Sequence, residues 1–193
     1  MASAERIPHV AEGTEMILNN DLRPEQYNPH SIRMLERASI RAFMELHRDK
    51  LTGRVLDFGA GKQPYRDLCT GEYVPFEKGE NMGPDAGFDA IICNQVIEYV
   101  KNPRIILRQL WDCLKDGGHL VLTYPSAWPE VDGDLPDFWR FTKAGINMLL
   151  ADVSFEVLHH EMRAEVMLNG FQFPLGGGVV ARKVGVWALT PKL

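Results

Sequence analysis

The chain has 193 residues, of which 45% are hydrophobic and 24% charged, with a formal net charge of -5. These values are ordinary for a soluble globular protein, and the length indicates one domain with a good core. The acidic balance counts against a nucleic-acid surface, which usually carries a basic patch. No apolar run approaches the roughly 18 residues that span a membrane, and a signal-peptide core is missing, so we expect a cytoplasmic protein without membrane or nucleic-acid partners.

Cysteines and adjacent histidines are the residues that could indicate a metal site. Cys69, Cys93 and Cys113 lie in apolar segments without metal-ligand spacing, which predicts reduced core thiols. His159 and His160 are neighbours in an expected strand, where consecutive side chains point to opposite faces. The sequence therefore predicts no metal site.

Hydrophobic periodicity divides the chain into an arm and one α/β domain. Residues 1–30 are polar and proline-containing, which predicts an N-terminal arm or lid ahead of a single domain at 31–193. Apolar residues at helical spacing predict the following helices: 32–49, 103 to about 116, and 143 to about 151. Short apolar runs predict the following strands: 54–58, 73–77, 88–94, 119–125, 155–160 and 179–189.

Caps and glycines set the expected boundaries of these elements. Asn102 and Thr142 precede two of the helices as N-caps, and Gly117 is suited to follow the second one. Residues 125–141 form a long irregular stretch, and such loops are usually functional. Residues 167–178 are apolar and glycine-rich, which we interpret as a flexible flap or a helix.

A glycine turn after the first strand is the feature around which the domain is organised. Gly59 and Gly61 can adopt positive φ and bring the backbone close to a ligand, although Pro64 replaces the third glycine of a dinucleotide fingerprint. Glu77 ends the second strand, 18 residues beyond Gly59. A carboxylate there accepts hydrogen bonds from the two hydroxyls of a ribose.

The order of motifs along residues 50–190 resembles the class I S-adenosylmethionine-dependent methyltransferases. The segments that carry the resemblance are 55–61, Glu77, 88–100 and 114–120. The resemblance implies an α/β fold: a Rossmann-like, mostly parallel sheet with helices on both faces and an antiparallel last strand. It also implies S-adenosyl-L-methionine as cofactor, held by the following residues: Asp57, Gly59, Ala60, Gly61, Glu77, Asn94 and Gln95.

Two segments bear on how far the resemblance extends. Only ten residues separate Glu77 from Phe88, so the family's third strand is expected to be shortened or missing, with Asp85 as the nearby carboxylate for adenine. Residues 137–142 resemble a segment of small bacterial methyltransferases in saccharide or natural-product pathways.

The resemblance implies methyl transfer to an oxygen or nitrogen of a small molecule by direct displacement, in a monomer or homodimer. Asp137 and Arg140 in the long loop are candidate catalytic residues, and Arg140 could clamp an anionic acceptor. The alternative is that Arg140 pairs with Asp137 while Trp139 and Phe141 anchor the loop.

Three further side chains are candidates for the active site, and two other functions are alternatives to methyl transfer. Tyr27 and His30 are candidate catalytic residues on a lid, and Glu98 either faces the acceptor or starts a helix. One alternative function is a non-catalytic cofactor-binding protein on the same fold. The other is a nicotinamide-dependent oxidoreductase, against which Pro64 and the lack of a Tyr-x-x-x-Lys pair count.

Overall fold

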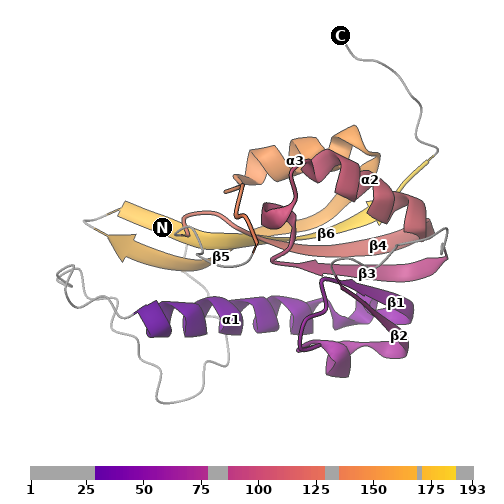
Figure 1. Ribbon diagram of the computed structural model, residues 1–193, viewed down its shortest axis with the longest axis horizontal. Coiled ribbons are helices and arrows are strands. Elements are labelled where there is room, and N and C mark those ends of the chain that lie inside the picture. The colour runs from indigo at the N-terminus through magenta and orange to yellow at the C-terminus, as the bar shows by residue number, and fades with distance from the viewer. Residues whose placement is uncertain (1–28, 78–86, 129–134, 169–170, 186–193) are drawn as a thin grey trace, which may run out of the picture.

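The computed structural model describes residues 29–77, 87–128, 135–168 and 171–185, which form a sheet covered by helices on both faces (Figure 1). Its six strands lie in the order β2-β1-β3-β4-β6-β5. The strands are β1 (Thr52–Phe58), β2 (Thr70–Phe76), β3 (Phe88–Asn94), β4 (Leu114–Pro125), β5 (Phe155–Leu168) and β6 (Phe171–Lys183). β1 to β4 are parallel, and β6 runs antiparallel to β4 and β5. This confirms the predicted Rossmann-like architecture.

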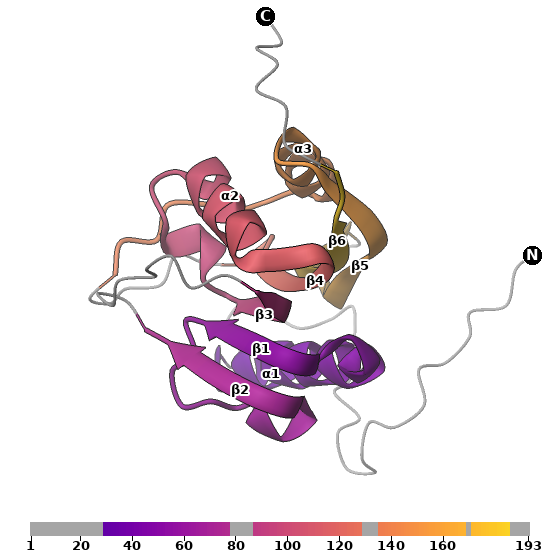
Figure 2. The same ribbon diagram turned by 90° about the vertical axis from the view of Figure 1, so that its right-hand side faces the viewer.

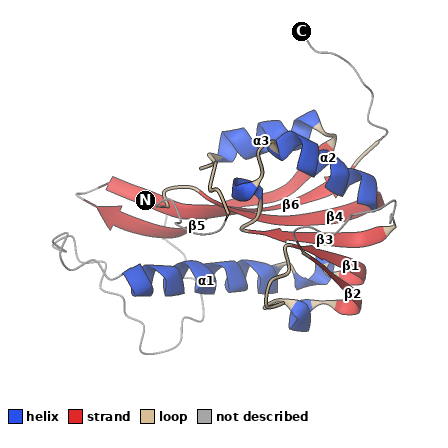
Figure 3. Ribbon diagram, in the orientation of Figure 1, coloured by secondary structure: helices blue, strands red, loops and turns tan. Residues whose placement is uncertain are grey.

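Helices cover the two faces unequally. α1 (Pro29–Leu46) lies on one face, and α2 (Pro103–Cys113) and α3 (Lys143–Asp152) lie on the other (Figure 3). The three short 3-10 helices in the described ranges are Arg48–Lys50, Arg66–Leu68 and Ile97–Tyr99. The predicted caps are confirmed, since the Asn102 and Thr142 side chains accept hydrogen bonds from backbone N–H groups three residues later. No helix in these ranges has the length and apolar character needed to cross a membrane.

Consecutive strand residues point into two separate cores. Ile91 packs with Leu110 of α2 on one face, and its neighbour Ile92 packs with Phe43 of α1 on the other. All three aliphatic side chains are completely buried, and each such burial stabilises the fold by about 1.5–3 kcal/mol. Because both faces are covered, the strand is a continuous apolar run without alternation.

The C-terminal prediction was wrong in its details. The segment 167–178, expected to be a flap or helix, belongs mostly to a long hairpin of β5 and β6, which the sequence divided into shorter strands. Its glycines have a packing reason: a Cβ would lie 2.3 Å from the Tyr124 ring at Gly177 and 2.8 Å from the Phe43 ring at Gly178. Large side chains from both cores therefore require a strand without side chains at these positions.

Two further boundaries differ from the prediction. β2 begins and ends earlier than expected, so Glu77 follows the strand instead of ending it. α2 ends at Cys113, and β4 begins at once, with a shift of its pairing to β3 that accommodates Gly117 at φ 77°. Gly117 therefore serves a bulged strand and not a helix end.

The third strand that was expected to be shortened or missing falls in a segment of which residues 78–86 lie outside the described residues. Within the described ranges no strand lies between β2 and β3 along the chain, and β2 is the edge strand (Figure 2). Asp85 lies outside the described residues.

Candidate active site

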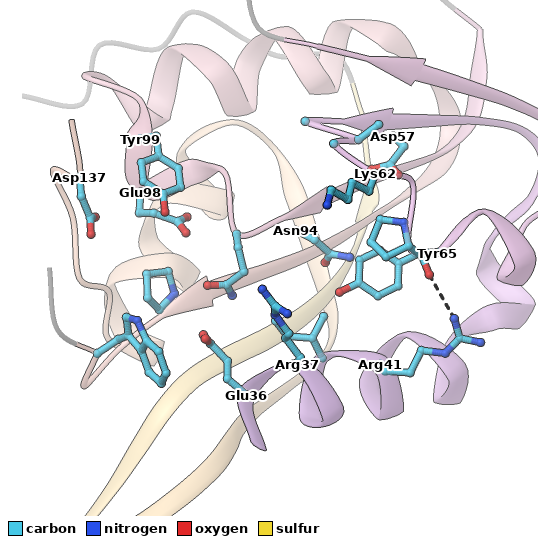
Figure 4. Close-up of a pocket in the computed structure, with 18 of the residues that line it drawn as sticks. Glu36, Arg37, Arg41, Asp57, Lys62, Tyr65, Asn94, Glu98, Tyr99 and Asp137 are labelled. Carbon is cyan, nitrogen blue, oxygen red and sulfur yellow. Dashed lines mark hydrogen bonds between the residues drawn. The ribbon is translucent and has the colours of Figure 1, made fainter. Parts of the chain in front are cut away.

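A cavity of about 620 Å³ opens where the carboxyl ends of β1, β3 and β4 face α1 (Figure 4). Ligands of open α/β sheets bind at this edge. The predicted site residues that line the cavity are Asp57, Gly59, Ala60, Gly61, Asn94, Gln95, Asp137 and Arg140. Glu77 is exposed beside β2 and is not among the described residues that line the cavity.

The two glycines of the turn have different roles. Gly59 has φ 80°, and a Cβ on it would lie 2.4 Å from Val96 Cγ2, so it allows the turn to pack against the segment after β3. Its N–H donates to the Phe76 carbonyl oxygen at 2.8 Å. Gly61 has φ 49°, and a Cβ on it would meet no atom of the described residues within 4 Å, so it leaves open space beside the cavity.

Arg41 joins the turn to α1. Its guanidinium donates to both carboxylate oxygens of Asp67, at 2.9 and 2.5 Å, and to the Pro64 carbonyl oxygen at 3.2 Å. Glu45 on α1 accepts a further hydrogen bond from Arg41 at 2.6 Å. These hydrogen bonds connect α1, which forms one wall of the cavity, to the loop after the glycine turn, which forms another wall.

Asp57 is a buried carboxylate beneath the turn. It is 2% exposed, and the Tyr73 hydroxyl of the neighbouring strand donates to Oδ2 at 2.5 Å. Burial raises the pKa of Asp57 to about 6, the Tyr73 hydrogen bond opposes this shift, and the Glu77 charge adds to it. The Asp57 carboxylate is therefore positioned by the Tyr73 hydroxyl, and the negative charge of Glu77 acts on it.

The end of β3 presents polar side chains to the cavity. The Thr123 hydroxyl donates to Asn94 Oδ1 at 3.1 Å, while Asn94 Nδ2 is buried without a hydrogen-bond partner among the described residues. Gln95 adopts φ 51° and can turn its amide nitrogen toward Glu36 Oε1 on α1 at 3.3 Å. Because buried amide donors are normally satisfied, Asn94 Nδ2 indicates a place for a ligand acceptor atom.

The long loop forms the opposite end of the cavity. Arg140 donates to both oxygens of Asp137, at 2.6 and 2.5 Å, and to the Trp128 carbonyl oxygen at 2.7 Å. The Trp139 indole donates to the Val100 carbonyl oxygen at 2.8 Å, and Phe141 is buried. The structure thus shows the pairing and anchoring alternative, and most of the Arg140 donors are already engaged.

Replacing Asp137 with asparagine is expected to destabilise the fold. The Asp137 side chain is 1% exposed and Arg140 is 26% exposed, so the loss is about 1–3 kcal/mol, below the 3–5 kcal/mol of a fully buried pair. Thermal unfolding measures it. Asp112→Asn is the matched control, because Asp112 pairs with Arg108 at the surface and should contribute under about 0.5 kcal/mol. Equal losses of stability in both variants would contradict the conclusion that the Asp137–Arg140 pair stabilises the fold more than a surface ion pair does.

Glu98 is a second buried carboxylate, on the short helix after β3. It is 2% exposed, and Oε2 has no hydrogen-bond partner within the described part of the chain. Burial raises the pKa of Glu98 to about 8; a hydrogen bond from its own backbone and the Arg140 charge oppose the shift, and the Asp137 charge adds to it. The sequence analysis considered Glu98 but left its role open.

Other lining residues were missed because nothing local marks them. Glu36 and Arg37 lie on α1, and Tyr65 lies in the loop after the glycines (Figure 4). The amphipathic pattern predicted α1, but it could not indicate which turn crosses the cavity. His30 lies in the first turn of α1, where side chains are not described, and Tyr27 lies outside the described residues. Among the described residues, no group of three or more His, Cys, Asp and Glu side chains is placed to hold a metal ion.

Comparison with known proteins identifies the class. The family model described as a methyltransferase domain matches residues 30–162, so the chain belongs to this family. Together with the structural neighbours, this match defines an S-adenosylmethionine-dependent methyltransferase, and S-adenosylmethionine is the cofactor. No curated protein matches the chain.

Three solved structures show the same fold at low identity. A protein from Listeria monocytogenes, assigned as an S-adenosylmethionine-dependent methyltransferase, has a TM-score of 0.62 at 12% identity, with 79% of this chain and 100% of that chain covered. A methyltransferase from Mesorhizobium loti has a TM-score of 0.52 at 15% identity, covering 75% and 95%. The Burkholderia thailandensis 1,6-didemethyltoxoflavin-N1-methyltransferase, solved with bound 1,6-didemethyltoxoflavin and S-adenosylhomocysteine, has a TM-score of 0.55 at 14% identity, covering 82% of this chain and 92% of that chain.

Proposed function

We propose that this methyltransferase transfers the methyl group to an oxygen or nitrogen atom of a small-molecule acceptor by direct displacement. The observation that carries the proposal is one cavity that joins the glycine turn to the end of the long loop. Its volume, about 620 Å³, is within the range of about 300–1,000 Å³ that small-ligand sites occupy. The acceptor of the Burkholderia neighbour is a small molecule, in agreement with this proposal.

The residues at the glycine end fit S-adenosylmethionine. Gly61 leaves open space, Asn94 Nδ2 has no partner among the described residues, and Asp57 offers a carboxylate near the turn. We infer that these residues hold the amino-acid part of the cofactor and that Glu77 holds the ribose. When bound, the cofactor supplies a methyl carbon on a positively charged sulfur that leaves as a neutral thioether.

The loop end of the cavity is left for the acceptor. Tyr99 and Trp128 offer aromatic walls, while Glu36, Glu98 and Asp137 offer carboxyl groups. Such a mixture of apolar walls and a few polar groups orients a small ligand. In this arrangement the chain brings the acceptor into line with the methyl group, and most of the catalysis comes from positioning. Tyr27 and His30 stay predictions as residues of a lid over this end.

The decisive experiment is calorimetric titration with S-adenosylhomocysteine, with NADH as the parallel ligand. We expect micromolar binding of S-adenosylhomocysteine and no binding of NADH. The Asp57→Asn change should raise the dissociation constant for S-adenosylhomocysteine at least about tenfold, because it removes the charge from a charge-assisted hydrogen bond.

A control and a screen complete this test. Glu72→Gln changes an exposed carboxylate that pairs with Arg54 on the neighbouring strand, and it should leave the constant within about twofold. An unchanged constant for Asp57→Asn would remove Asp57 from the site. Tight binding without formation of S-adenosylhomocysteine from S-adenosylmethionine, over a broad panel of hydroxyl and amine acceptors, would favour the non-catalytic alternative.

A further inference from the structure

Glu98 stands out among the cavity side chains because one of its carboxyl oxygens has no hydrogen-bond partner in the described part of the chain. The side chain is 2% exposed, and its Oε2 is buried without a partner among the described residues. Figure 4 shows the Glu98 carboxyl group next to Tyr99 and pointing toward the middle of the cavity. An acceptor atom in this state loses free energy unless a ligand donates to it.

Within the described ranges, the surrounding charged groups leave Glu98 without a cationic partner of its own. Arg140 is the cation that acts on it from the long loop, but that guanidinium holds both oxygens of Asp137. The other ionisable groups that act on Glu98 or feel its charge are Asp137 of the loop, Glu36 of α1, Tyr99 of the same short helix and Cys93 of β3. These groups are acidic, so none of them favours the ionised carboxylate, which is favoured only in part by a hydrogen bond from the Glu98 backbone and by the Arg140 charge.

We propose that Glu98 is the catalytic base that accepts a proton from an un-ionised O–H or N–H group of the acceptor. This inference rests on the proposed function and narrows its substrate class. The acceptor donates its hydrogen bond to Oε2, and its ring or chain lies against Tyr99 and Trp128. Carboxylate and phosphate acceptors are excluded, because Arg140 is engaged and the other groups around Glu98 are acidic.

The proton transfer balances with the methyl transfer. The lone pair of the acceptor oxygen or nitrogen forms the new bond to the methyl carbon, and the electron pair of the broken carbon–sulfur bond stays on sulfur. The proton of the acceptor passes to Glu98 Oε2, and solvent removes it after the product leaves. Burial raises the pKa of Glu98 to about 8, which suits a base that works near neutral pH.

The test measures S-adenosylhomocysteine formation by the full chain with S-adenosylmethionine and five probes: phenol, catechol, benzylamine, imidazole and benzoate. We expect turnover of at least one O–H or N–H probe and none of benzoate. The kcat/KM for that probe should rise about tenfold per pH unit and level off near pH 8. Glu98→Gln should lower kcat by about 100- to 10,000-fold and abolish the rising limb, while KM changes far less.

The matched control is Glu156→Gln. Glu156 is an exposed carboxylate on β5 that pairs with Arg182, away from the cavity lining, so this variant should keep the wild-type pH profile. A Glu98→Gln enzyme that keeps both kcat and the rising limb would overturn the assignment of the base. Efficient methylation of benzoate would overturn the substrate class.

A second readout separates this inference from the proposed function. In protein labelled with ¹³C at glutamate carboxyl carbons and saturated with S-adenosylhomocysteine, the signal missing from Glu98→Gln should shift when an O–H or N–H probe is added. A shift without turnover would support the contact and count against the methyl-transfer proposal. No shift with any probe would overturn the role of Glu98, even where S-adenosylhomocysteine binds and another acceptor is methylated.

Discussion

The Gly59→Ala protein should bind S-adenosylhomocysteine at least about tenfold more weakly than the wild type and unfold at a lower temperature. Two physical effects combine at this position. The backbone has φ 80°, which a residue with a side chain adopts at a loss of about 1–2 kcal/mol. The new Cβ would also lie 2.4 Å from Val96 Cγ2, and overpacking of this kind destabilises by about 1–3 kcal/mol.

The two effects can be separated by two further variants. Gly61→Ala has φ 49° but no atom of the described residues within 4 Å of the new Cβ, so it should show only the backbone loss. In Gly59→Ala/Val96→Ala the crowding side chain is shortened, and part of the stability lost in the single variant should return. Each 1 kcal/mol corresponds to roughly 2–4 °C in the midpoint of thermal unfolding for a chain of this size. If Gly59→Ala and Gly61→Ala behaved alike, contact with Val96 would not be the reason for the glycine.

The structural features that the sequence predicted correctly are those determined by residues close together in the chain. The turn at Gly59, the cap at Asn102 and the apolar strand that holds Ile91 are local patterns, and the structure confirms each of them. The expectation of a shortened or missing third strand also followed from a local fact, the ten residues between Glu77 and Phe88, and stays a prediction. Local patterns were enough here because the backbone conformation of a turn, a cap or a strand depends strongly on the residues nearest in sequence.

The hairpin of β5 and β6 could not be predicted in the same way. Gly176, Gly177 and Gly178 indicate flexibility when only their neighbours in sequence are considered. Their actual environment comes from distant residues, Arg163, Tyr124 and Phe43, which fill the space that side chains would otherwise occupy. Tertiary packing therefore decided the conformation of a segment whose own composition had indicated a flexible flap or a helix.

The candidate site likewise contains residues that local motifs predicted and residues that only the tertiary structure brings to the cavity. Asp57 and Asn94 lie at the ends of the strands that line the cavity, and the motif order identified them. Glu36 lies 21 residues before Asp57 on a helix that has no motif, so only the crossing of α1 over the sheet edge brings it to the cavity. Glu98 was considered from the sequence, but its burial and its unpartnered oxygen are tertiary properties, which arise where the distant loop of Phe138 contacts its backbone and the charges of Asp137 and Arg140 act on it.

Glu98→Gln should make the fold more stable than the wild type, and increasingly so as the pH rises. The folded-state pKa of Glu98, about 8, lies above its ordinary value of 4.5. The folded wild type therefore retains a proton that the unfolded chain has lost, and the stabilising contribution of the protonated group is complete below pH 4.5. It disappears as the pH rises through 8, because the carboxyl group must then either hold its proton or ionise in a buried site.

Glutamine has nearly the same shape and no charge to lose, so it avoids this penalty. The difference in unfolding free energy between Glu98→Gln and wild type should be smallest near pH 4.5 and should grow to about 4 kcal/mol near pH 8. Urea unfolding at half-unit steps of pH measures it. Glu156→Gln, which removes a surface ion pair, should change stability by under about 1 kcal/mol over the same range. A constant difference for Glu98→Gln at all pH values would mean that this carboxyl group titrates normally, and the energetic cost that favours its use as a base would be absent.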